Sequence, residues 1–221
     1  SVGAAPIQNI GAYGIEQKDA FVSLRAVDRS TGNIVWFSKE ECRFGYRDSI
    51  FKNEAKDKYI IVAVQYLLQK NTQPEMGYKD VKELLSERGI KQPTVLELAQ
   101  AVIDIREAKL PNPSVIGNAG SFFKNPVISL ENFESLKNTF PEIPNYPAGE
   151  GQIKLAAAWL IDQCGYKGKR HGNTGSYQNQ ALVIVNHGGA TGTEIWEYAQ
   201  MIQQDVKTKF GVELEAEVNV W

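Results

Sequence analysis

The hydrophobic pattern of the chain changes its period part-way along the sequence. Before residue 70, the runs Phe21 to Val27, Ile34 to Phe37 and Tyr59 to Leu68 are rich in alternating or β-branched apolar residues, which predicts strands. After residue 92, Thr94-x-x-Glu97 and Thr191-x-x-Glu194 are capping boxes, and each opens a run of apolar residues at helical spacing. Strands followed by helices predict an α+β fold.

Further elements are predicted in the second half of the chain. The apolar spacing around Phe133 predicts a short helix that ends before Pro141, and residues 154–164 predict a buried helix. Leu182 to Asn186 predicts a short strand. Val212 to Trp221 alternates strictly and predicts a last strand, which we expect to return to the first region.

The composition excludes several classes of protein. The 24 Lys and Arg residues are balanced by 26 Asp and Glu residues, so there is no basic footprint for nucleic acid. Two cysteines and two histidines cannot form a disulfide framework or a zinc cluster. The longest apolar run is far shorter than the ~20 residues of a membrane span. We therefore expect a cytoplasmic protein with no nucleic acid, membrane or metal partner.

Glycines and cations supply candidate anion sites. The segment Gly3 to Gly14 can cradle a phosphate through its backbone N–H groups, or it can be a structural turn. Arg47, in an aromatic-rich loop, can bind a carboxylate or a flavin oxygen, or form a surface ion pair. Arg106 and Lys109 share one helix face and can bind a pyrophosphate, or simply complement the helix dipole.

Ser121 is the candidate hydroxyl group for chemistry. It lies in the segment Gly117 to Pro126, where small residues precede it and two phenylalanines follow it. Because the motif contains no histidine, a serine hydrolase has little support, whereas a serine that donates a proton beside stabilising groups is chemically reasonable. A serine that caps a turn is the structural alternative.

Three carboxylates alternate near the C-terminus. Glu213, Glu215 and Glu217 share one face of the predicted last strand. Crowding of like charges favours the protonated form of one of them, which suits a general acid. An exposed strand edge that carries charge is the alternative explanation.

Several long motifs, taken together and in order, resemble one known family. They are Pro6 to Gly14, Cys42 to Lys52, Gly117 to Pro126 and Leu214 to Val218, supported by Lys154 to Asp162. This set resembles the UDP-N-acetylenolpyruvoylglucosamine reductases, the MurB family of peptidoglycan synthesis, over essentially the whole chain. Ala216 and Asn219 depart from the family pattern, which usually has proline and arginine there.

The resemblance implies an NADPH-dependent FAD oxidoreductase that reduces UDP-N-acetylglucosamine enolpyruvate to UDP-N-acetylmuramate. It implies that Ser121 donates the proton and that Arg47 and Glu217 stabilise the developing charge. The substrate-binding residues it implies, with Tyr78 marking the subtype that has a tyrosine loop, are Tyr78, Arg106, Lys109, Asn125, Lys167 and Gln180. The FAD-binding residues it implies are Pro6, Ile7, Gln8, Asn9, Gly11, Ala12 and Tyr13.

The resemblance also implies a domain organisation. Residues 1–97 correspond to the second half of an FAD-binding α+β domain of the PCMH type. Residues 98–205 correspond to a smaller α+β substrate-binding domain, and residues 206–221 to a returning strand that carries Glu217. The family's N-terminal Gly-x-Gly-Ser-Asn loop does not occur in this sequence. We therefore expect the chain alone to bind FAD weakly, to be inactive and to be monomeric. A non-enzymatic module that binds UDP-sugars remains the alternative.

Overall fold

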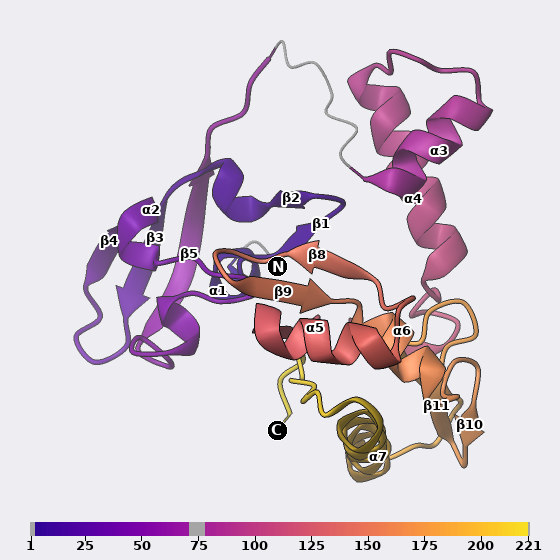
Figure 1. Cartoon of the computed structure of the whole chain (residues 1–221). Helices are drawn as coiled ribbons and strands as arrows, with labels where there is room; N and C mark the ends of the chain where they lie inside the picture. The colour runs from indigo at the N-terminus through magenta and orange to yellow at the C-terminus, as the bar shows by residue number, and fades with distance from the viewer. Residues whose placement is uncertain (1–2, 71–77, 221) are drawn as a thin grey trace. The chain divides into compact units, whose positions relative to one another are not determined.

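The structure is a computed structural model that describes residues 3–70 and 78–220 (Figure 1). Packing divides the chain into two units, Ser1–Ile103 and Asp104–Trp221, and the division falls within helix α4, Val95–Lys109. The functional domains suggested at 1–97, 98–205 and 206–221 remain predictions, because this division reflects packing alone. None of the helices in the two described ranges is long and apolar enough to cross a membrane.

A three-stranded antiparallel sheet organises the first unit. Its order is β4–β3–β5, formed by Ile34–Ser38, Phe21–Asp28 and Tyr59–Tyr66, so all three predicted strands are confirmed. Phe21, Leu24 and Ala26 of β3 face the core. They pack there with residues from α2 (Lys39–Cys42), from η2 (Ile50–Lys52) and from the turn that follows: Cys42, Ile50, Phe51 and Ala55.

Short elements surround this sheet. The first residues form helix α1 (Ala4–Ile7), a two-stranded ribbon of β1 (Gly11–Ala12) and β2 (Ile15–Glu16), and the 3-10 turn η1 (Gln17–Asp19). Helix α3 (Lys79–Glu87), which was not predicted, buries Val81 and Leu85. The predicted capping box at the start of α4 is present, because the Glu97 N–H donates to Thr94 Oγ1 at 3.2 Å and the Thr94 N–H donates to Glu97 Oε2 at 2.7 Å.

The second unit has two sheets and one large core. The first sheet has the order β10–β11–β12–β6, formed by Arg170–His171, Thr174–Ser176, Val183–Asn186 and Gly117–Ser121. The second has the order β7–β9–β8, formed by Val127–Ser129, Gln152–Leu155 and Asn145–Pro147. Its helices are α5 (Leu130–Thr139), which lies along the second sheet in Figure 1, α6 (Ala157–Gln163) and α7 (Gly192–Phe210).

The strand predicted at Leu182 to Asn186 is confirmed by β12, but β6 to β11 of the second unit were not predicted. These strands have two to five residues each. Segments this short give little periodic signal. The segment Gly117–Ser121 is rich in glycine and small residues, which disfavour strands in isolation. Pairing with β12 makes it a strand.

The helix predicted over residues 154–164 is partly wrong. Residues up to Leu155 belong to β9, which pairs with both β7 and β8, and α6 begins only at Ala157. The side chain of Asn125 explains the helix start, because its Oδ1 accepts a 2.9 Å hydrogen bond from the Ala157 N–H. The sequence has no local capping residue before Ala157, so the first residue of α6 depends on a side chain that is distant in the sequence.

The regular last strand predicted over Val212 to Trp221 is also wrong. Among residues 212–220 only Ala216 forms a bridge, with Phe123, and Trp221 lies outside the described residues. The alternation itself holds, since Val212 and Leu214 are buried whereas Glu213 and Glu215 are exposed. This segment, which we call the C-terminal tail, pairs with residues 122–124 of its own unit instead of the first region.

Candidate active site

Arg47 is held at the edge of the opening segment in the first unit. It lies in a tight turn closed by reciprocal backbone hydrogen bonds between Gly45 and Asp48, and its φ of 54° is in the left-handed region. Its side chain is only 16% exposed. The guanidinium donates from Nη2 to the carbonyl oxygen of Gly11, and Nη1 is 3.9 Å from Glu16 Oε1. Arg47 therefore contacts the segment that was predicted to bind FAD.

The predicted FAD-binding residues occupy α1 and the ribbon after it. Pro6 and Ile7 are in α1, Gln8 is its C-cap, Gly11 and Ala12 form β1, and Tyr13 is in the turn to β2. Asn9 is fully buried and its φ is 41°. Gly11 has no room for a side chain, because a Cβ there would lie 2.8 Å from the Ile15 carbonyl oxygen. The segment therefore forms a short helix and a two-stranded ribbon with close packing at Gly11, and is not an open glycine-rich loop.

Tyr78 meets the same segment. It lies at the N-cap of α3, and its ring packs edge-on against the ring of Tyr13 with 5.0 Å between the centroids. A residue predicted to bind substrate and one predicted to contact the flavin are thus in direct contact within the first unit. The preceding residues of the predicted tyrosine loop, 74–77, lie outside the described residues.

Backbone pairing in the second unit brings Glu217 to Phe122, the residue that follows Ser121. Ser121 ends β6 and is exposed. The C-terminal tail runs antiparallel to the next residues, with the Lys124 N–H donating to the Glu215 carbonyl at 2.9 Å and the Glu217 N–H donating to the Phe122 carbonyl at 2.8 Å. An ion pair between Lys124 Nζ and Glu215 Oε1 reinforces this pairing. Glu217 therefore lies beside the residue that follows Ser121.

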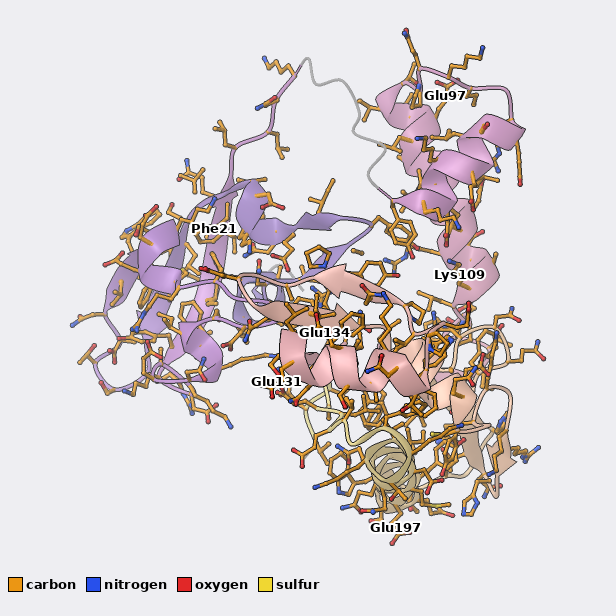
Figure 2. The ribbon with its side chains drawn as sticks, in the orientation of Figure 1. Phe21, Glu97, Lys109, Glu131, Glu134 and Glu197 are labelled. Carbon is orange, nitrogen blue, oxygen red and sulfur yellow. The ribbon has the colours of Figure 1, made fainter. Side chains whose placement is uncertain are left out.

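The predicted diphosphate cations lie at one end of a helix. Arg106 and Lys109 are in the last turn of α4, and Figure 2 shows Lys109 at this end of the helix. The side chain of Asn179 donates to the carbonyl oxygen of Ala108 at 3.0 Å, which ties the helix end to the loop that contains Gln180. Arg106, Lys109 and the loop of Gln180 thus lie near the C-terminal end of α4.

The two remaining predicted residues have structural partners. Asn125 uses its side-chain oxygen to cap α6, as described above. Lys167 is exposed, and its Nζ is 3.9 Å from Asp162 Oδ2. Its neighbour Gly168 lies against Gln178, since a Cβ on Gly168 would be 3.6 Å from the Gln178 Cα. The loop of Lys167 is therefore adjacent to the loop of Gln180.

Other nucleophiles in the described chain are poorly suited to catalysis. Burial raises the pKa of the Cys42 thiol to about 12, so this cysteine stays protonated at neutral pH. Among residues 104–220, neither of the two histidines forms a hydrogen bond with Ser121. His171 stacks on the ring of Tyr198, with the centroids 5.9 Å apart, and a Cβ on Gly175 would lie 3.2 Å from His187 Nε2. Within the described part of the chain, neither histidine is therefore bonded to Ser121 as the base of a serine nucleophile would be.

Comparisons with known proteins identify the family. Residues 112–221 match the family model described as UDP-N-acetylenolpyruvoylglucosamine reductase, C-terminal domain. Proteins named UDP-N-acetylenolpyruvoylglucosamine reductase from Paraburkholderia phytofirmans and Pseudomonas aeruginosa are 52% and 49% identical to this chain, over 98% and 100% of it. The chain belongs to the UDP-N-acetylenolpyruvoylglucosamine reductase (MurB) family. It spans 63% and 65% of the lengths of these two relatives.

The fold of this MurB chain agrees with a solved member of the family. The crystal structure of the reductase from Thermus caldophilus matches with a TM-score of 0.61 and 23% identity, over 100% of this chain and 60% of that one. The predicted α+β fold is thereby confirmed.

Two functional candidates in this MurB chain were missed by sequence reasoning. Glu16 contacts the Arg47 guanidinium, and Lys124 anchors the tail that carries Glu217. Neither residue has a periodic or spacing signal, because each depends on a partner that is distant in the sequence. The only local indication for Lys124 was its place in the motif that follows Ser121.

Proposed function

We propose that this MurB chain carries catalytic and substrate-binding groups of a cytoplasmic UDP-N-acetylenolpyruvoylglucosamine reductase of peptidoglycan synthesis. The proposed reaction adds a hydride equivalent to C3 and a proton to C2 of the enolpyruvyl group, so that UDP-N-acetylglucosamine enolpyruvate becomes UDP-N-acetylmuramate and NADPH becomes NADP⁺. The names of the relatives support this reaction. The observation that supports the proposal is the backbone pairing of Glu217 with Phe122, the residue that follows Ser121.

Ser121 is the proposed proton donor. Addition of hydride at C3 leaves negative charge at C2, next to the carboxylate of the substrate. A donor that is already in place there stabilises the transition state without reorganisation. Arg47 is proposed to stabilise this charge as a fixed cation, and Glu217 as a hydrogen-bond donor in its protonated form. The exposure of Ser121 at the end of β6 supports its access to substrate.

FAD is the proposed cofactor, and the opening segment of the chain fits it. Ile7 and Ile10 expose apolar side chains by 38% and 48%, which suits contact with a flat ring system. The Gln17 Nε2 atom is buried and has no hydrogen-bond acceptor among the described residues, so a donor is available beside this segment. When bound, FAD supplies the hydride transfer from NADPH to the substrate. Pro6 to Asn9 and Gly11 to Tyr13 are proposed to hold it.

The nucleotide part of the substrate is proposed to bind at the end of α4. Arg106 and Lys109 would bind the diphosphate. The loop of Gln180 contacts this helix end through Asn179, and the loop of Lys167 lies against the loop of Gln180. Asn125 and Tyr78 complete the proposed substrate set. The protein is proposed to act as a monomer.

The proposal is tested by Ser121→Ala in the protein that carries this chain. We expect kcat for substrate-dependent NADPH oxidation to fall by about 10²- to 10⁴-fold, the usual contribution of general acid catalysis. Flavin reduction by NADPH alone should continue at the wild-type rate, because it needs no proton from Ser121. Ser121→Cys should recover part of the rate, since a thiol can also donate a proton.

Ser135→Ala is the matched control, because Ser135 is an exposed serine on α5. It should leave both rates unchanged. A Ser121→Ala enzyme with wild-type turnover would overturn the proposal. Substrate binding without turnover in the wild-type protein, with FAD and NADPH present, would favour the UDP-sugar binding module. The visible spectrum of the 221-residue chain before and after addition of FAD tests flavin binding separately.

A further inference from the structure

We propose that Glu16 is a positioning residue that fixes the guanidinium of Arg47, and that Asn9 locks the two segments involved. The proposal rests on the proposed function only in the catalytic role it gives to Arg47. The positioning itself is a property of the first unit, and it follows from the contacts of three buried or half-buried side chains.

Arg47 needs external support to keep its side chain in one place. A long side chain loses rotamer entropy when it is fixed. The left-handed backbone of Arg47 adds a further cost in free energy, and such backbone strain occurs where the surrounding structure determines it. Its guanidinium is bonded to the Gly11 carbonyl, lies 3.9 Å from Glu16 and is 5.2 Å from the ring centroid of Tyr46. Among these three contacts, Glu16 supplies the opposite charge.

Glu16 is itself held rigidly. It lies where β2 meets η1, and its backbone N–H donates to Asp19 Oδ2 at 2.8 Å in a capping box. One carboxylate oxygen, Oε2, accepts from Asn9 Nδ2 at 3.2 Å and pairs with Lys18 Nζ at 2.7 Å. The other oxygen, Oε1, is the one that faces Arg47. The carboxylate is therefore oriented before it meets the guanidinium, as a positioning group must be.

Asn9 ties three segments together through one buried amide. Its Nδ2 donates to Glu16 and also to the Gly45 carbonyl at 2.8 Å, and its Oδ1 accepts from the Lys18 N–H at 3.2 Å. Gly45 closes the turn that presents Arg47. The Asn9 side chain is 0% exposed, so its amide serves the protein interior. Asn9 thus fixes the turn of Arg47 relative to the carboxylate that faces it.

The charges of this group suit an anionic transition state. Arg47 and Lys18 contribute two positive charges, and Glu16 contributes one negative charge between them. Because Lys18 also pairs with the Glu16 carboxylate, Glu16 can orient the guanidinium without fully cancelling its positive charge. Replacement of Glu16 by glutamine keeps the shape but removes the ionic contact, so the guanidinium should become mobile.

The first test measures the accessibility of Arg47 in the 221-residue chain and needs no catalytic activity. Phenylglyoxal modifies arginine, and mass spectrometry gives the rate at each site. We expect Glu16→Gln to raise the rate at Arg47 by about fivefold, the factor that follows from loss of one ordinary polar contact. Glu54→Gln is the matched control, because Glu54 forms an exposed ion pair with Arg43, and it should leave the rate at Arg47 unchanged.

Glu16→Asp provides a second variant if the glutamine variant unfolds. It keeps the charge but shortens the side chain, and it should give an intermediate rate at Arg47. Circular dichroism establishes that each variant is folded. An unchanged rate at Arg47 in a folded Glu16 variant would overturn the positioning proposal.

The second test measures kinetics in the protein that carries this chain. Glu16→Gln should lower kcat by about tenfold and leave KM for the sugar nucleotide within about twofold, since the lost interaction acts in the transition state. In an Arg47→Lys background the same substitution should have little further effect, because both changes remove one coupled unit. Equal effects in both backgrounds would overturn the proposal. If Arg47 becomes accessible but Arg47→Lys leaves kcat unchanged, the positioning stands and the catalytic role of Arg47 fails.

Discussion

The backbone N–H of Glu217 donates a 2.8 Å hydrogen bond to the carbonyl oxygen of Phe122. Together with the bond from the Lys124 N–H to the Glu215 carbonyl, it flanks the bridge between Phe123 and Ala216. In an antiparallel pair, residues between two such bonds do not exchange hydrogen bonds with each other. The N–H of Ala216 therefore points away from the 122–124 segment, and the N–H of Glu217 points toward it.

This alternation predicts opposite effects of proline at adjacent positions. Ala216→Pro removes no hydrogen bond to the 122–124 segment. It should leave the free energy of unfolding unchanged or raise it by up to ~1 kcal/mol, because proline lowers the conformational entropy of the unfolded chain. Glu217→Pro removes the donor to Phe122 and should destabilise by about 1 kcal/mol or more. Urea denaturation of the two variants measures the difference. Equal losses of stability would show that the C-terminal tail is not paired in this register.

The capping box of α7 predicts a loss of stability on substitution. The Glu194 N–H donates to Thr191 Oγ1 at 3.2 Å, and the Thr191 N–H donates to Glu194 Oε2 at 2.7 Å. Thr191→Ala should therefore lower the free energy of unfolding by about 1 kcal/mol. Thr193→Ala, at an exposed position in the same turn, is the control and should change it by less than about 0.5 kcal/mol.

The same cap predicts a dependence on pH. Hydrogen bonds from the Thr191 backbone and side chain lower the pKa of Glu194 from its usual 4.5. Because the folded pKa is the lower one, this carboxylate stabilises the fold above about pH 4.5 and loses that contribution as the pH falls through the lowered pKa. Glu194→Gln should therefore weaken the acid dependence of unfolding, measured from pH 7 to pH 2. If the stability of Glu194→Gln fell with decreasing pH as steeply as that of the wild type, this role of Glu194 would be contradicted.

Close backbone packing at Gly175 predicts a steric cost. Gly175 lies in β11, where a Cβ would be 2.7 Å from the Lys169 carbonyl oxygen and 3.1 Å from the Arg170 Cα. Since both contacts are backbone, neither can move cheaply, and Gly175→Ala should destabilise by about 1–3 kcal/mol. Gly192→Ala is the control, because no atom lies within 4 Å of its Cβ position. That variant should be neutral or stabilised by up to ~1 kcal/mol in thermal unfolding.

Local patterns predicted the elements whose stabilising contacts are close in sequence. The capping boxes at Thr94 and Thr191 start helices because donor and acceptor are three residues apart. The apolar pattern of β3 predicted the strand and two of its core residues, Leu24 and Ala26, although Phe21 is buried and Val22 is exposed where the register shifts. The same reasoning failed for α6, whose start depends on the distant Asn125, and for β6, which is a strand only through its pairing with β12.

The candidate site shows the same division. The motifs alone placed Arg47, Ser121 and Glu217 in the MurB pattern, since motif resemblance needs no three-dimensional information. The sequence thus determined the fold class and the family, and it supplied the candidate site residues. The tertiary structure decided that the Asn9 amide is buried between three segments, that Glu16 faces Arg47 and that the C-terminal tail pairs with residues 122–124. These contacts join residues far apart in the chain, and hydrogen bonds at that separation form only once the core has brought the segments together.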